Sequence, residues 1–254
     1  TSTGGRLTAT GAQFFGDGST DTYIYIAIRK GPMKVPTSGT SVFGLNARSG
    51  TGAVATVTGG QTDDAVLIKN RGSAVASLFA SRLTGTNYLV TSSTAAQVAA
   101  GTTILQANPW DVMDGVKVGT TSTITNATSN TYINYLFKRA PSVFDVVCYT
   151  GTGANATITH NLAAVPEMMI VKSRTATWNW AVYHSALGNT KFILLDSDGG
   201  PVTQSTVWNN TSPTSSVFTV GSAGYTNASA GNYVAYLFAT CAGVSKVGSY
   251  TGTG

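Results

Sequence analysis

Histidines and paired acids are the residues of this sequence best suited to acid–base or metal chemistry. His160 and His184 are its two histidines, and neither has a Cys or Glu cluster nearby. An imidazole can act as a base or a metal ligand, but a metal site gathers several such ligands. Acids are paired at Asp63–Asp64 and at Asp111 and Asp114, but glycoside hydrolysis needs two carboxylates that face one cleft, which this spacing does not indicate. We therefore predict no catalytic residue, no metal and no cofactor.

Two short motifs resemble ligand-binding loops without completing them. Asp196–Gly200 reads DSDGG, like the start of a calcium loop, but the twelfth position, where an EF-hand has Glu, is Val207. The TGTG at 150–153 and again at 251–254 lacks the Lys-Ser/Thr ending of a phosphate-binding loop. Both motifs predict turns, because Asp-Gly and Gly-rich segments readily adopt positive φ.

The segment WNWAVYH is the candidate ligand-binding motif. On a strand it would place Trp178 and Trp180 on one face and Tyr183 on the other. Exposed tryptophans stack on sugar rings, so a candidate glycan contact comprises Trp178, Trp180, Tyr183 and His184. The alternative is that both tryptophans pack in a core, where aromatic side chains bury most area.

Composition favours a secreted or virion β-protein over a cytoplasmic enzyme. Charged residues make up 10% of the 254 residues, against about 25% in ordinary globular domains, and Thr, Ser, Gly and Asn supply most polar positions. The net charge of +5 comes from small, separated groups of Lys and Arg, so we predict no nucleic-acid partner. No apolar run reaches 18 residues, which predicts no membrane insertion. Cys148 and Cys241 fit neither a metal spacing nor a disulfide framework, and their state stays open.

An internal repeat is the main organising feature. Tyr132, Tyr135, Leu136 and Phe137 in NTYINYLF match Tyr233, Tyr236, Leu237 and Phe238 in GNYVAYLF, at an offset of 101 residues. VVCYTGTG, which ends at Gly153, matches the final VGSYTGTG at the same offset. AVLIKNR and MMIVKSR align 103 residues apart, which small loop insertions explain.

The repeat predicts four segments. These are 1–33, the C-terminal part of a preceding repeat; 34–141, repeat 1; 142–242, repeat 2; and 243–254, the first strand of a following repeat. Because the sequence also starts at Thr1, we expect a processed chain or a fragment of a longer array. In an alternative that stays open, the last strand, Val247 to Thr251, pairs with the edge of another copy.

Short apolar runs bounded by turn residues predict an all-β fold of tandem antiparallel β-sandwich, jelly-roll-like domains of about 100 residues each. Asn232 to Phe238 is apolar on both faces, which predicts a strand buried on both sides. Thr94 to Ala100 is the one segment where we expect a helical turn. In repeat 2 we expect seven strands: 143–149, 156–160, 167–172, 179–183, 191–195, 216–220 and 232–238.

Several ordered motifs of repeat 2 carry a resemblance to a known group of proteins. VPEMMIVKSRTATWNWAVYHSALGNTKFILLDS, STVWNNTSPTSSVFTVG, NYVAYLFA and GSYTGTG resemble repeated modules of tail-fibre and other virion structural proteins of marine bacteriophages, including cyanophages. The resemblance covers Phe144 to Gly254 and extends poorly to repeat 1. It implies a β-sandwich module on a virus particle.

The expected function is therefore structural. We expect a component of a bacteriophage virion, a tail fibre or spike protein that contributes to assembly and host attachment and is not an enzyme. Its expected partners are further copies of itself, with trimers implied by the resemblance, other virion proteins and a host-surface glycan. The alternative is a carbohydrate-binding, lectin-like module of a secreted bacterial protein. A polysaccharide depolymerase would additionally need a clustered pair of acids.

Overall fold

The same ordered set of strands occurs twice along the chain. The structure, a computed structural model, describes residues 34–253, so the predicted part of a preceding repeat, 1–33, lies outside the described residues. The first set is β1 (Phe43–Ser49), β2 (Ala55–Val57), β3 (Ala65–Asn70), β4 (Leu78–Ser81), β5 (Asn87–Val90), β6 (Val98–Ala99), β7 (Val116–Val118) and β8 (Thr131–Phe137). The second set is β9 (Phe144–Thr150), β10 (Ala156–Thr159), β11 (Met168–Ser173), β12 (Ala181–His184), β13 (Lys191–Leu194), β14 (Val202–Thr203), β15 (Val217–Val220) and β16 (Asn232–Phe238).

Helical segments are short. The first set contains η1 (Gly39–Ser41), η2 (Arg82–Thr84) and α1 (Gly101–Ile104), and the second contains α2 (Ser205–Trp208) and α3 (Gly224–Asn227). None of the helices within residues 34–253 has the length and apolar character needed to cross a membrane.

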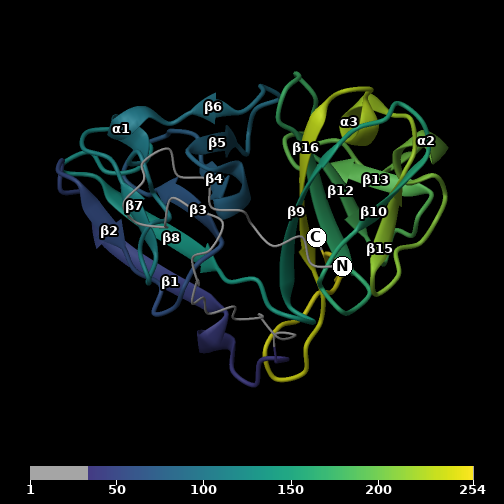
Figure 1. The fold of residues 1–254 in the computed structure, drawn as a ribbon, viewed down its shortest axis with the longest axis horizontal. Coiled ribbons are helices and arrows are strands. Elements are labelled where there is room, and N and C mark those ends of the chain that lie inside the picture. The colour runs from purple at the N-terminus through teal and green to yellow at the C-terminus, as the bar shows by residue number, and fades with distance from the viewer. Residues whose placement is uncertain (1–33, 254) are drawn as a thin grey trace, which may run out of the picture. The chain divides into compact units, whose positions relative to one another are not determined.

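Strand order is identical in the two sets, which Figure 1 shows as two groups of strands. The first six-stranded sheet runs β1-β8-β3-β4-β5-β6, and the second runs β9-β16-β11-β12-β13-β14. Each set adds a two-stranded sheet, β2-β7 or β10-β15, and every ladder is antiparallel. The predicted all-β antiparallel sandwich fold is confirmed, with two layers of unequal size. We call β1–β8 the first repeat and β9–β16 the second.

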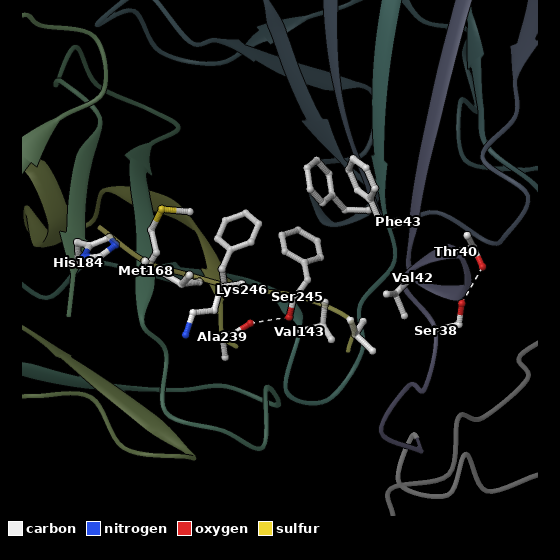
Figure 2. Close-up of a pocket in the computed structure, with 17 residues that line it drawn as sticks. Ser38, Thr40, Val42, Phe43, Val143, Met168, His184, Ala239, Ser245 and Lys246 are labelled. Carbon is white, nitrogen blue, oxygen red and sulfur yellow. Dashed lines mark hydrogen bonds between the residues drawn. The ribbon is translucent and has the colours of Figure 1, made fainter. Parts of the chain in front are cut away.

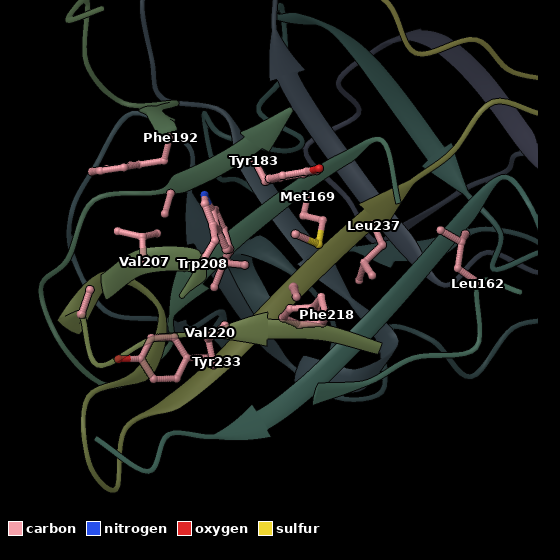
Figure 3. Close-up of a cluster of buried hydrophobic side chains, with 14 of the residues drawn as sticks. Leu162, Met169, Tyr183, Phe192, Val207, Trp208, Phe218, Val220, Tyr233 and Leu237 are labelled. Carbon is pink, nitrogen blue, oxygen red and sulfur yellow. The ribbon is translucent and has the colours of Figure 1, made fainter. Parts of the chain in front are cut away.

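Each repeat has a hydrophobic core between its six-stranded and its two-stranded sheet. In the first, Val66 and Leu136 pack against Val57 and Val116. In the second, side chains from β11, β12 and β16 pack against β15 and α2, as Figure 3 shows for Trp208 and its neighbours. A third cluster joins the outer faces of the two six-stranded sheets, and the described residues accordingly form one compact unit.

A buried asparagine closes each repeat at the same point. The Asn227 side-chain amide donates to Gly221 O at 2.8 Å, to Thr152 Oγ1 and to Ala154 O, while its Oδ1 accepts from the Thr152 N–H at 2.8 Å. Asn126 makes the corresponding bonds in the first repeat, to Gly119, Thr51 and Ala53. Both side chains are fully buried. Each asparagine therefore ties the loop after the first strand to the segment before the last strand.

All seven strands predicted in repeat 2 occur, within two residues at each end. β16 is buried at every position from Tyr233 to Leu237, because β11 and β9 flank it and both of its faces are covered.

One expectation about local structure is wrong, one stays a prediction, and one short strand was not predicted. Thr94 to Ala100 is not a helical turn: Val98–Ala99 pairs with β5, and the turn follows at Gly101, whose φ is +56°. Val247 to Thr251 forms no strand with the described residues. The two-residue β14 was not predicted, because so short an exposed pairing leaves no sequence pattern.

Replacing Asn227 by Asp should destabilise the protein by about 3 kcal/mol, because it removes the amide donors and buries a charge among carbonyl oxygens. Urea unfolding followed by circular dichroism measures this change. The exposed Asn155→Asp is the matched control and should stay within about 0.5 kcal/mol of wild type. Equal effects of the two substitutions would contradict the closing role of Asn227.

Candidate functional site in the contact between the repeats

The outer faces of the two six-stranded sheets are apolar. Strand register places the following side chains in one row across the first sheet: Leu45, Tyr135, Leu67, Phe79 and Leu89. The corresponding row across the second sheet is Val146, Tyr236, Ile170, Val182 and Ile193. Antiparallel sheets often leave one face in water, but here both faces of each sheet carry apolar side chains. The outer faces therefore need a cover.

Aromatic stacking forms the centre of the contact between these faces. The Phe79 ring lies 4.0 Å from the Tyr236 ring, centroid to centroid, with 13° between their planes. The Trp180 ring also stacks with the Phe79 ring, with 6.4 Å between the centroids and 12° between the planes. Phe137 contacts Phe144 across the same contact at 5.1 Å. Burial of such side chains, at about 25 cal/mol per Å² of apolar area, makes this core a major source of stability.

Trp180 also carries the polar anchor of the contact. Its indole N–H lies 3.1 Å from both Val90 O and Ser93 O in the first repeat, and its side chain is fully buried. Asp196 fixes the backbone at this point by accepting the Trp180 N–H at 3.1 Å. Trp180, which we predicted to contact a glycan, therefore binds the first repeat.

The other members of the predicted glycan contact lie in different surroundings. Trp178 is half-buried, with its ring edge-on to Tyr225 at 5.3 Å. Tyr183 is buried in the core of the second repeat, against Trp208 at 5.9 Å. The predicted shared face of Trp178 and Trp180 is wrong, because β12 begins only at Ala181 and the preceding backbone is irregular.

A second group of polar bonds lies at the β6 end of the contact. Lys172 Nζ donates to Thr94 O at 2.9 Å, and Arg174 Nε donates to Gln97 Oε1 at 2.7 Å. The Gln97 N–H donates in turn to Arg174 O at 3.0 Å. Burial lowers the pKa of Lys172 to about 8, and the nearby carboxylate of Asp196 opposes this shift.

An apolar pocket opens where the repeats are joined (Figure 2). Its volume is about 610 Å³, within the range of small-ligand pockets. Three chain segments line it: the entry to the first repeat at 38–43, the joint at 143–144 and the exit at 244–248. His184 and Met168 line one part and Phe43 another, as Figure 2 shows. His184 Nδ1 accepts the Ala186 N–H at 3.1 Å, so its Nε2 can donate toward a polar group.

The joint and the exit share one turn geometry. The Ala140 N–H donates to Phe144 O at 2.9 Å, and 101 residues later the Cys241 N–H donates to Ser245 O at 3.1 Å. The exit therefore has the geometry that leads into the first strand of a repeat.

The remaining candidate residues lie apart from this site. His160 is buried, which lowers its pKa, and its Nε2 lies 3.2 Å from Thr214 O. Asp63 is fully buried, and its pKa is raised to about 6 mainly by that burial. Within residues 34–253 no three His, Cys, Asp or Glu residues gather as metal ligands, and Cys148 and Cys241 form no disulfide there.

Sequence reasoning missed the main residues of the contact, Phe79, Phe137 and Tyr236. The last two were recognised as repeated residues but not as contact residues. The sequence did contain a signal for these residues. The positions of the two outer-face rows are apolar in both repeats, whereas surface positions do not need to be apolar.

Comparison with known proteins gives one match. Residues 139–254 match the model of a domain of unknown function (DUF7483). This stretch contains the whole second repeat together with the joint before it and the exit after it. No curated protein and no solved structure matches the chain.

Replacing Trp180 by Phe should lower the free energy of unfolding by about 1–3 kcal/mol, because Val90 O and Ser93 O lose the indole donor and a cavity forms. Chemical unfolding monitored by fluorescence of the remaining tryptophans measures it. Trp178→Phe is the control and should cost less than about 1 kcal/mol, since that ring is only half-buried. A larger loss from Trp178→Phe would argue against Trp180 as the anchor.

Lys172 should make stability depend on pH. The unfolded chain has the ordinary lysine pKa of about 10.4, so between about pH 8 and 10 it binds more protons than the folded chain, and stability rises with pH. Relative to Lys172→Met, wild type should gain about 1–2 kcal/mol between pH 7 and 9.5. Urea titrations of both proteins at several pH values test this, and a pH-independent difference would refute it.

Proposed function

We propose that this protein is a structural component of a bacteriophage virion, a tail fibre or spike protein that acts in assembly and host attachment. The observation that carries the proposal is the buried contact between two copies of one fold, centred on Phe79, Tyr236 and Trp180. A sheet that is apolar on both faces needs a neighbour, and a repeat supplies that neighbour within the same chain. This property suits a protein whose role is to build an extended assembly.

Two further observations support the proposal. The exit at Cys241–Ser245 has the geometry of the joint that leads from the first repeat into the second, so the fold has a standard connection for continuing an array. Only 10% of the residues of the chain are charged and the formal net charge is +5, so repulsion between copies is weak. The sequence motifs of repeat 2 resemble those of phage virion proteins.

The lectin-like alternative gains no support from the tryptophans. A sugar-stacking platform needs an exposed aromatic face, whereas Trp180 and Tyr183 are buried in two different cores. We therefore propose no second function.

Gradient-purified virus particles from the source culture provide the test. Mass spectrometry should detect this chain in the particles at a stoichiometry comparable to other minor structural proteins, and gold-labelled antibodies should mark a projection from the particle. A phage replication protein is the matched control and should be absent from the same fractions. Recovery of the chain only as free secreted protein, with none in the particles, would refute the proposal.

A further inference from the structure

Within residues 34–253, the outer face of the first sheet is only partly covered. At its β1 and β8 side, Leu45 is 62% exposed and Phe43 is 39% exposed. Ala47 is also exposed, and Ile133 and Tyr135 are half-buried. Leu45 pairs with Tyr135 and Ala47 with Ile133, and Phe43 lies next to Leu45 on the same face of β1. We call these five residues the β1–β8 strip. Exposed apolar area of this kind commonly marks an interaction site.

The second repeat shows what such a strip binds. Its corresponding residues on β9 and β16 include Phe144 and Val146, each 1% exposed, and Tyr236, which is fully buried. The cover is another copy of the same fold: Phe79 and Phe137 of the first repeat lie on this face, and Leu83 O lies 3.9 Å from Cys148 Sγ. A strip of this sequence and register is therefore complementary to an apolar face of a second repeat.

The part of the repeat that could cover the β1–β8 strip is limited. Phe79 and Leu89, at the other end of the same row, are already buried against the second repeat. The large exposed apolar side chains of this face, Phe43 and Leu45, belong to the strip. Two identical strips can meet across a two-fold axis, which is the commonest arrangement of identical subunits.

Charges do not oppose this pairing. The strip contains no charged side chain, and the neighbouring cations Arg48, next to Ala47 on β1, and Lys69, the cross-strand partner of Ile133, both donate to groups of the first repeat. Arg48 bonds to Asn126 and Thr125, and Lys69 Nζ donates to Val75 O at 2.7 Å. The formal net charge of +5 on 254 residues adds only weak repulsion between copies.

We propose that two copies of this chain associate through their β1–β8 strips across a two-fold axis. The contact deepens the proposed function, since it supplies an assembly surface, but it stands on the packing of the repeats. Leu45 is more exposed than Phe43, the other large exposed side chain of the strip, so Leu45 is the residue to change.

Sedimentation of the full chain tests the contact. Wild type at about 100 μM should sediment with the mass of two copies. Leu45→Glu and Leu45→Lys should each weaken association at least about tenfold, because each buries a like charge beside its symmetry mate. An equimolar mixture of the two variants should recover the dimer at low salt. Val202→Glu, at an aliphatic residue of 43% exposure on β14, is the matched control and should remain dimeric.

Each other outcome counts against the proposal. A monomeric or trimeric wild type, or a dimer that the Leu45 variants leave intact, would overturn the strip as the contact. Failure of the mixture to restore the dimer would overturn the two-fold arrangement. Thermal unfolding of every variant identifies any loss of fold. The substitutions of Leu45 should not unfold the protein, because this side chain is exposed. If wild type is monomeric but is present in virus particles, this inference fails while the proposed function stands.

Discussion

The burial of one sheet face against another, centred where Phe79 meets Tyr236 and Trp180, is the constraint on which the structure depends. Each six-stranded sheet has two apolar faces, and its own two-stranded sheet covers only one. An isolated repeat would expose the other face to water, at a cost proportional to the apolar area. The repeat is thus a unit of sequence and topology, while the stable unit contains two repeats.

The two repeats have diverged to fit one another. Trp180 corresponds to Ser77 in the first repeat, and Phe79 corresponds to Val182 in the second. A large side chain in one repeat thus has a small counterpart in the other, and the large ones stack on each other. Protein interiors are packed closely. If both repeats had the large side chain at each of these two positions, the two sheets would need a different distance between them.

The sequence predicted the fold well and the site poorly, for different physical reasons. Strands such as β11 and β16 were predictable because apolar runs, β-branched residues and turn residues are local properties. The closing role of Asn126 and Asn227 was not predicted, although their identity at the repeat offset was visible, because a sequence does not tell a buried amide from an exposed one. The face on which Trp178 lies depended on where β12 begins, and strand ends are weakly encoded. An apolar face was predictable, but the chain segment that covers it was not.

The turn at the joint between the repeats recurs after the second repeat. The turn at Cys241–Ser245 has the backbone hydrogen bond of the turn at Ala140–Phe144. Each turn is closed by a bond within its own five residues. Phe144, the residue that starts the second repeat after this turn, is Ser245 after the exit, and Ser245 lines the open pocket. The same turn thus places a buried phenylalanine in the contact between the repeats at the joint, and a polar residue beside the same apolar pocket at the exit.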